Sequence, residues 1–286
     1  MRFATRQGPA AWALAEPVAL RRPASHVLTK PWAPRRGIVL LLVLSAVVTA
    51  SPAARAGWAD TRTVGPLVCR ADFPLSGFDG LLAELSALQA EVSAALDLGP
   101  SREPIEIYLF RDQVAQRNYL SRYLPTVPYR RALYVKGRGP GRVFTALGPE
   151  LQTDLRHECT HAFLHARLRD VPLWLDEGLA QYFETSPSQR VASPHQFDEM
   201  RRRLWGGYSP DLAKLEKKTE LAEMGEVEYR DSWAWVHFML LGPPPARQEL
   251  LAYLAQLQQN PSAIPLSERL PARLPQLAQQ LTDHFR

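Results

Sequence analysis

The chain has 286 residues and a hydrophobic content of 46%, enough to bury a sizeable core in one or two lobes. The formal charge of +5 arises in the first 56 residues, which hold eight of the 34 Lys and Arg residues but one of the 29 acidic residues. Residues 1–56 thus carry a net charge of +7 and the rest of the chain −2, a balance that argues against a nucleic-acid partner.

Residues 1–56 have the parts of an export signal. Arg35 and Arg36 precede an apolar run of about 14 residues, 37–50, shorter than the roughly 20 residues of a membrane-spanning helix. Ala54-Arg55-Ala56 fits the small-residue rule for signal cleavage and predicts a mature chain from Gly57. We therefore expect a periplasmic or extracellular protein without a membrane span; anchoring by an uncleaved leader is the alternative. The long stretch before the Arg pair fits either a start further downstream or a loose twin-arginine signal.

Residues 57–148 predict a sheet-containing lobe of α+β type. Alternating apolar residues indicate a strand at 105–110, and further strands are expected at 67–71, 132–135 and 142–147. A short helix is expected at 111–123. The clearest helix is 78–98, which Gly99-Pro100 ends. Its apolar stripe consists of Leu81, Leu85, Leu88, Val92 and Leu96.

Residues 149–286 predict a helical lobe, which forms one domain, 57–286, together with the first lobe. Helices are expected at 151–169, 174–184, 196–204, 212–224 and 229–241, followed by two or three amphipathic helices in 247–286. The polar span 185–193 is predicted to be a loop. The Gly-Pro-Pro-Pro stretch 242–245 is predicted to end the helix at 229–241.

The pattern His157-Glu158-Cys159-Thr160-His161 reads H-E-x-x-H, a metal-binding signature of helices. Residues four apart lie on one helix face, so His157 and His161 can direct their imidazoles at one metal ion. Glu158 lies about 100° round the helix from His157, beside the metal, where a general base is needed. Catalytic zinc keeps three protein ligands, and Glu177 in the next predicted helix is well placed to be the third.

This pattern, followed by W-L-D-E-G-L-A-Q-Y-F-E at 174–184, resembles the gluzincin metallopeptidases, in particular the exported proteins called peptidase-MA-like. The gap between the two motifs is shorter than in the aminopeptidase branch. The resemblance implies a zincin-like fold with a zinc cleft between the sheet-containing and helical lobes. It also implies one zinc ion held by His157, His161 and Glu177, with Glu158 as the catalytic base.

Gluzincins also place a Tyr or His beyond the third ligand, where it donates to the developing oxyanion. By this resemblance Tyr229 is the catalytic candidate and Tyr208 the alternative, although a structural role is open for either. The metzincin family is excluded, because Leu164 and Arg167 stand where that family has Gly and His.

Four further polar residues have alternative interpretations. His165 lies one turn beyond His161 and is either a fourth ligand or, as we favour, a polar residue at the helix end. Glu184 either hydrogen-bonds a ligand His or is an ordinary polar position. Asp176 is predicted to be a surface or capping residue, and His237 a packed core residue.

The two cysteines, Cys69 and Cys159, permit a disulfide in an exported chain. We favour the interpretation that both cysteines are small buried apolar residues, because Cys159 falls on the helix side opposite the two motif His.

The function we expect is that of an exported zinc-dependent peptidase with a peptide or protein substrate. The strand at 142–147 is expected to line the cleft and pair with an extended substrate. The alternatives are a non-hydrolytic zinc-scaffold binding module of the cell envelope, for protein or glycan, and a core helix without metal. Glu158 argues against the first alternative, because a binding module does not need a general base. Glu177 argues against the second, because a core helix without metal does not need a third ligand in this setting.

Overall fold

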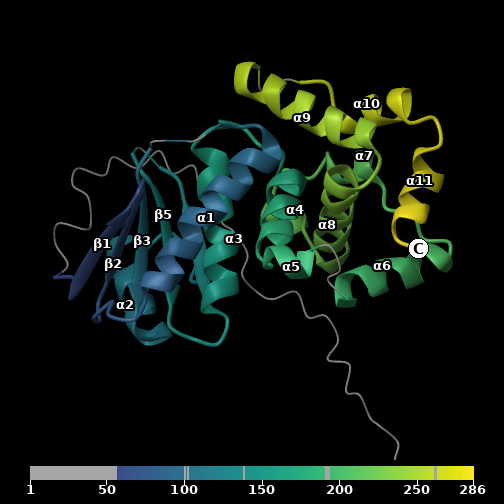
Figure 1. Cartoon of the computed structure of the whole chain (residues 1–286). Helices are drawn as coiled ribbons and strands as arrows, with labels where there is room; N and C mark the ends of the chain where they lie inside the picture. Colours follow the sequence, from purple (N-terminus) through teal and green to yellow (C-terminus); the bar gives the residue numbers. More distant parts are fainter. Residues whose placement is uncertain (1–56, 100, 102, 138, 191–193, 261–262) are drawn as a thin grey trace, which may run out of the picture. The chain divides into compact units, whose positions relative to one another are not determined.

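The computed structural model describes residues 57–99, 101, 103–137, 139–190, 194–260 and 263–286. The chain divides into two units, 1–32 and 33–286, and every described residue belongs to the second. The predicted leader, 1–56, lies outside the described residues. The described part is α+β, with a mixed sheet in its N-terminal portion and helices in its C-terminal half, as predicted (Figure 1).

The sheet has five strands in the order β1-β2-β3-β5-β4. Their bounds are β1 (Asp60–Val64), β2 (Leu67–Ala71), β3 (Ile105–Phe110), β4 (Ala132–Val135) and β5 (Gly141–Ala146). The three inner strands run parallel, while β1 pairs antiparallel with β2 and β4 pairs antiparallel with β5. The four predicted strands are confirmed to within one residue at each end.

Two features of the sheet differ from the prediction. β1 was not expected, because its sequence D-T-R-T-V is polar and its residues are only half-buried or exposed. The strand at 142–147 was expected to pair with substrate, and this is wrong. β5 lies between β3 and β4, so both of its hydrogen-bonding edges are occupied, and β4 is the outer strand on that side.

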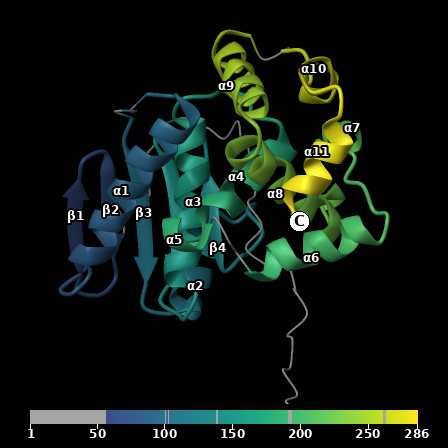
Figure 2. The same cartoon turned by 45° about the vertical axis from the view of Figure 1, so that its right-hand side comes forward.

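The two faces of the sheet bury different side chains. Ile105, Ile107 and Leu109 of β3 join the large core that includes α1 (Asp79–Leu96) and α3 (Leu151–His165). Tyr108 and Phe110, which alternate with them, join a smaller cluster with α2 (Gln113–Tyr123). Helices therefore cover both faces, and α3 lies along the sheet beside α1 (Figure 2). This arrangement fixes the helix that carries the H-E-x-x-H pattern against a buried sheet.

The helices after α3 pack on one another rather than on the sheet, with α4 and α8 in the most extensive contact. Their bounds are α4 (Leu173–Phe183), α5 (Pro187–Arg190), α6 (Pro194–Trp205), α7 (Leu212–Leu215), the 3₁₀ helix η2 (Leu221–Glu223), α8 (Glu226–Leu241), α9 (Pro244–Gln259), α10 (Leu266–Arg273) and α11 (Leu277–His284). Two or three amphipathic helices were predicted at the end of the chain, and the described residues there form three: α9, α10 and α11.

Three helical predictions are corrected. The helix predicted at 212–224 is broken into α7 and η2, because only Leu212 and Leu215 of α7 are buried and η2 buries no residue. The span 185–193 contains α5 among its described residues. α8 ends before Gly242, as predicted, but the next helix, α9, begins within the proline stretch at Pro244. A proline fits the first turn of a helix, because its missing N–H is not needed there.

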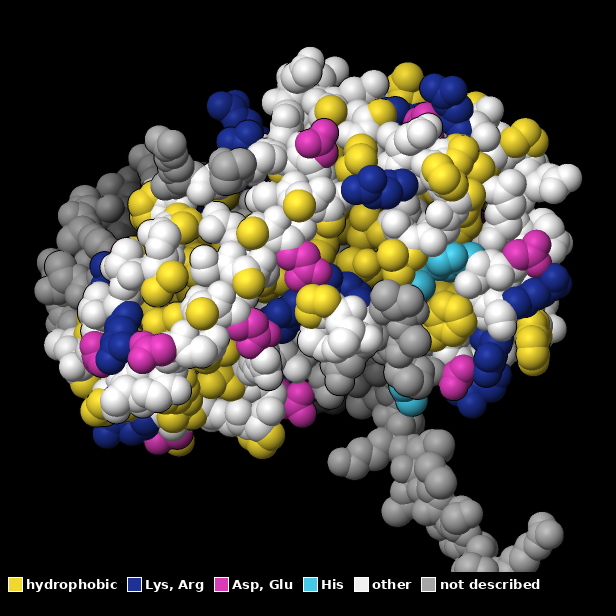
Figure 3. Space-filling model, in the orientation of Figure 1, with side chains coloured by type: hydrophobic (Ala, Val, Ile, Leu, Met, Phe, Trp, Pro, Cys, Tyr) yellow, Lys and Arg dark blue, Asp and Glu magenta, His cyan; other side chains and the backbone are white. Residues whose placement is uncertain are grey.

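Charged groups are distributed without one dominant sign on the face shown in Figure 3, where basic and acidic side chains are interspersed with apolar ones. In the part of the chain that the structure describes, none of the helices is both long and apolar enough to cross a membrane.

His237 is a packed core residue, as predicted. It lies on α8 among the rings of Trp233, Phe197 and Phe285, and its Nδ1 is 2.7 Å from His284 Nε2 on α11. Two imidazoles in this contact must share one hydrogen, with one nitrogen donating and the other accepting. Burial lowers the pKa of both His237 and His284 to about 4, so both are neutral at pH 7.

This pair should make the protein sensitive to mild acid. The pKa of His237 is lower in the folded chain than in the unfolded chain, so the unfolded chain binds more protons below about pH 6.5 and stability falls as pH falls from there toward 4. When the pH is lowered from 7 to 5, protonation of His237 in the unfolded chain should reduce the free energy of unfolding by about 2 kcal/mol. His237→Gln should reduce the fall in stability over this range, measured by urea unfolding, whereas substitution of the exposed His195 by Gln should not. An unchanged fall in the His237 variant would contradict this prediction.

Candidate metal centre

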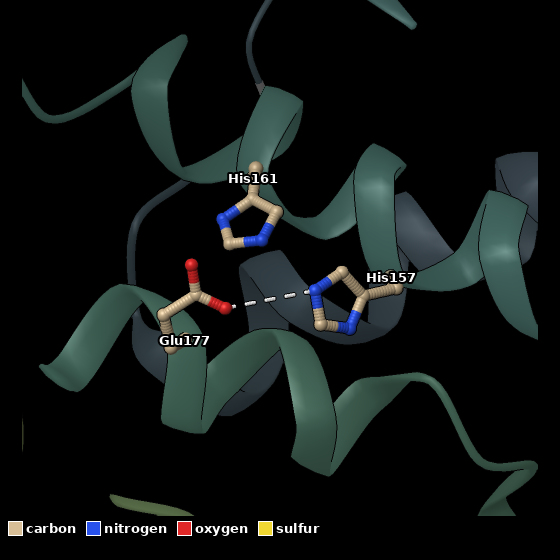
Figure 4. A group of neighbouring side chains, drawn as sticks. All are labelled: His157, His161 and Glu177. Atoms are coloured by element: carbon tan, nitrogen blue, oxygen red, sulfur yellow. Dashed lines mark ion pairs between the residues drawn. The ribbon is translucent and has the colours of Figure 1, made fainter. Parts of the chain in front are cut away.

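The structure brings the three predicted ligands together. His157 and His161 lie one turn apart on α3, and Glu177 faces them from α4 (Figure 4). Each residue offers a ligand atom within 4.8 Å of the others, and His157 Nε2 is 3.7 Å from Glu177 Oε2. All three side chains are buried. We call these three residues the triad.

The atoms that face one another in the triad have no hydrogen-bond partner among the described residues. They are Nε2 of His157, Nε2 of His161 and both carboxylate oxygens of Glu177. A buried polar atom without a partner costs about 1–3 kcal/mol, so several in one place need an explanation. A metal ion would satisfy all of them at once, and the triad therefore fits a metal ion by the chemistry of its donor atoms.

The other ring nitrogen of each His is held by a carboxylate. Glu184 Oε2 lies 2.9 Å from His157 Nδ1, and Asp176 Oδ1 lies 2.8 Å from His161 Nδ1. When each Nδ1–H donates to its carboxylate, the lone pair of Nε2 is directed into the triad. Of the two alternatives for Glu184, the structure therefore supports hydrogen bonding to a ligand His.

The prediction for Asp176 is wrong, because its side chain is a buried bridge. Asp176 is 2% exposed, and its second oxygen lies 3.0 Å from His165 Nε2. His165 is the last residue of α3, a polar residue at the helix end as we favoured; it is buried against Asp176 and is not part of the triad. A polar residue next to a predicted ligand was the only signal in the sequence, and it does not distinguish a bridge from a cap.

Opposing effects set the charges around the triad. Burial lowers the pKa of His157, but the nearby carboxylates of Glu177, 3.7 Å away, and of Glu184, in hydrogen-bond contact, outweigh it and raise that pKa well above its ordinary value. Burial also lowers the pKa of His161, and Asp176 outweighs it, so that pKa is raised. Burial would raise the pKa of Asp176, yet the two His that it bridges hold it well below its ordinary range. The acidic surroundings therefore favour positive charge at this place, which a metal cation could supply.

Glu158 lies beside the triad and outside it. It is 1% exposed, and its Oε2 has no hydrogen-bond partner among the described residues. Burial raises the pKa of Glu158 to about 7, while His157 and His161 oppose the rise. A carboxyl group with a pKa near neutrality can both accept and release a proton.

Tyr229 contributes a buried hydroxyl from α8. It is 4% exposed, and its Oη has no hydrogen-bond partner among the described residues. Burial raises the pKa of Tyr229, Glu177 and Glu158 raise it further, and Arg130 opposes the rise. Tyr208, the alternative candidate, donates its hydroxyl hydrogen to Asp231 and is therefore already engaged.

Gly178 explains how α8 comes so close to α4. A Cβ atom on Gly178 would lie 2.6 Å from the carbonyl oxygen of Ser232 and 2.8 Å from Val236 Cγ2. Only a residue without a side chain permits this contact between the two helices. Ser232 is one turn beyond Tyr229, so the contact brings the Tyr229 hydroxyl within electrostatic range of Glu177.

Arg156 holds the carboxyl end of α4, and sequence analysis missed it. Its Nε donates to the carbonyl of Phe183 at 3.0 Å, and its Nη2 donates to that of Thr185 at 3.1 Å. Its Nη1 donates to Glu84 on α1 at 2.8 Å. These bonds fix the backbone on both sides of Glu184, which holds His157. The available signal was an arginine directly before the H-E-x-x-H pattern.

Cys69 and Cys159 are both buried free thiols, which confirms the favoured interpretation. Burial raises the pKa of both thiols, to about 12 for Cys69, so neither is a reactive thiolate.

The comparisons with known proteins add one match. Residues 152–266 match a family described as a protein of unknown function (DUF1570). The matched range contains the triad, Glu158, Glu184 and Tyr229. No curated protein matches the chain.

The carboxylates of Glu177 on α4 and of Glu184 directly after α4 should differ in their effect on metal binding. Glu177→Ala removes a ligand atom and should weaken zinc binding by more than about 100-fold, whereas Glu184→Ala removes only support for a ligand and should cost about 10–100-fold. Competition with a chromogenic chelator measures both. Glu226→Ala, at an exposed acid of α8, is the control and should leave affinity unchanged. A larger loss for Glu184→Ala than for Glu177→Ala would reverse the two assignments.

Proposed function

We propose that this chain is an exported zinc-dependent peptidase of the gluzincin type with a zincin-like fold. The observation that carries the proposal is the buried triad with Glu158 beside it: the facing atoms of the triad and Oε2 of Glu158 have no hydrogen-bond partner among the described residues. The resemblance of 157–161 and 174–184 to gluzincin motifs adds support. We place the zinc cleft between the sheet-containing lobe, 57–148, and the helical lobe, 149–286.

Zinc suits this donor set better than the hard cations. Two imidazole nitrogens and one carboxylate make a zinc site of the catalytic kind, whereas calcium and magnesium prefer sites made of oxygen atoms alone. When bound, zinc would polarise a substrate carbonyl and lower the pKa of a water molecule. The protein's contribution is to hold His157 in place through Glu184 and His161 in place through Asp176.

Glu158 is the proton carrier in this proposal. Its Oε2 would accept a proton from the attacking water and then deliver it to the nitrogen of the leaving amine. Its buried setting supports this role, because the raised pKa allows the same group to act first as base and then as acid.

Tyr229 is the proposed donor to the oxyanion. Burial and two neighbouring carboxylates raise its pKa, so the hydroxyl keeps its hydrogen and can donate it to a developing negative charge.

The outer strand β4 takes over the role that β5 was expected to have. β4 pairs on one side with β5, and Tyr134 of β4 stacks on His161, with ring centroids 6.4 Å apart. An extended peptide added to the other side of β4 would run past the triad.

Glu158→Gln tests the enzyme against the binding module. The substitution removes the base but no ligand, so zinc content should stay close to that of the unmutated chain while peptide hydrolysis falls by about 10²–10⁴-fold. His157→Ala should lose both metal and activity, because it removes a ligand. Metal analysis and a peptide-library digest measure the two properties, with Glu226→Gln as the control. Hydrolysis at the unmutated rate in Glu158→Gln would reject the mechanism. Zinc binding without any cleavage by the unmutated chain would favour the binding module.

Export is proposed from the leader sequence alone. Cleavage after Ala56 should give a mature chain that begins at Gly57. Expression of the full chain in a bacterium, followed by fractionation and N-terminal sequencing, checks this. Recovery of an intact leader in the membrane fraction would support the anchored alternative, and recovery in the cytoplasm would reject export.

A further inference from the structure

Arg130 has a buried donor, and its charge has no partner among the described residues. Its Nε is buried without a hydrogen-bond partner, and among the described residues no carboxylate lies within ion-pair distance of its guanidinium group. Its side chain is partly exposed, so a ligand from solvent can reach it. Arg131, the next residue, differs: its Nη2 lies 2.6 Å from Asp154 Oδ1.

The neighbours of Arg130 place it beside the triad. Asp154, which pairs with Arg131, is on α3 one turn before His157. Tyr134, four residues after Arg130, stacks on His161. Arg130 therefore stands at the amino end of β4, at the end of the triad where His157 lies.

Two further observations support this location. The main chain of Arg130 is fixed, because its carbonyl accepts a hydrogen bond from the buried Gln116 of α2 at 3.2 Å. The Tyr229 hydroxyl is within electrostatic range of Arg130 as well as of Glu177 and Glu158, because all three affect its pKa. The backbone is thus positioned, and the guanidinium group lacks a counterion.

We propose that Arg130 is the binding residue for a carboxylate of the peptide substrate, presented beside the triad by the amino end of β4. Guanidinium binds carboxylate through two parallel hydrogen bonds, and a carboxylate is the anionic group that unmodified peptides carry. A peptide bound with its carboxyl end at Arg130 and its body along β4 would run antiparallel to that strand. The carboxylate is either the end of the peptide chain or an acidic side chain near the cleaved bond.

This inference rests on the proposed function for its substrate class, and three peptide libraries test it. All contain N-acetylated tripeptides of uncharged residues: one has a free carboxyl end, one has a carboxyl-terminal amide, and one has the amide with Glu fixed at the third position. The zinc-loaded full chain should cleave one carboxylate-bearing library with a kcat/KM about 10–100-fold above that of the uncharged amide library, in line with one hydrogen-bonded charge pair. Which of the two is preferred identifies the source of the carboxylate.

Arg130→Gln should reduce the ratio of kcat/KM between the preferred carboxylate library and the uncharged amide library to below about threefold. Arg130→Lys should retain part of this ratio, because lysine keeps the charge but not the paired hydrogen bonds of the guanidinium group. Arg122→Gln, at an exposed arginine of α2, is the matched control and should keep the full ratio. Equal cleavage of all three libraries by the unmutated chain, or an unchanged ratio in Arg130→Gln, would overturn the proposal.

A binding measurement separates failure of this inference from failure of the proposed hydrolysis. In zinc-loaded Glu158→Gln, at least one of the two carboxylate-bearing libraries should raise the melting temperature more than the uncharged amide library does, and the additional Arg130→Gln substitution should remove the difference. If nothing is cleaved but this difference is present, the carboxylate site stands and hydrolysis fails. If all libraries are cleaved equally, hydrolysis stands and the carboxylate site fails. Neither cleavage nor a difference dependent on Arg130 would reject both.

Discussion

Two helices present buried, unpartnered polar atoms to one another, and much of the surrounding structure serves to keep them there. Nε2 of His157 and of His161 faces the carboxylate of Glu177 across the space between α3 and α4. Each such atom costs about 1–3 kcal/mol when it has no partner, so the folded chain without a ligand at this place carries a stored cost. A cation that coordinates these atoms would remove this cost and bind tightly for the same reason.

Several independent contacts resist the collapse of this arrangement. α3 is fixed by its packing on the sheet and on α1, and Arg156 ties it to the carboxyl end of α4. The close contact at Gly178 fixes α8 against α4. Glu184 and Asp176 then fix the rings of the two His. Rigid support of this kind keeps ligand atoms in place within the small tolerance that metal binding needs.

Two carboxylates of α4 and a third at its C-cap illustrate how position on a helix gives chemically similar groups different contacts. Asp176 and Glu177 are adjacent in sequence but about 100° apart round the helix, so one reaches the outer nitrogen of His161 and the other faces the triad. Glu184 lies two turns beyond Glu177 on the same face and reaches His157 from outside the triad. Position on the helix relative to α3, rather than residue type, separates the group that could bind metal from the groups that support it.

The sequence by itself determined the features that depend on local spacing. The i, i+4 relation of His157 and His161, the chemistry of their donor atoms and the periodicity of α1 and β3 are properties of short segments. They were predicted correctly, except that α1 buries Leu82 and leaves the predicted Leu81 half-buried at the edge of its stripe. Tertiary structure decided the bridge from Asp176 to His165, the inner place of β5, the close approach of α8 at Gly178 and the position of Arg130 beside the triad. These depend on strand order and on how helices cross, which are set by packing between segments distant in the chain and leave no periodic signal in the sequence.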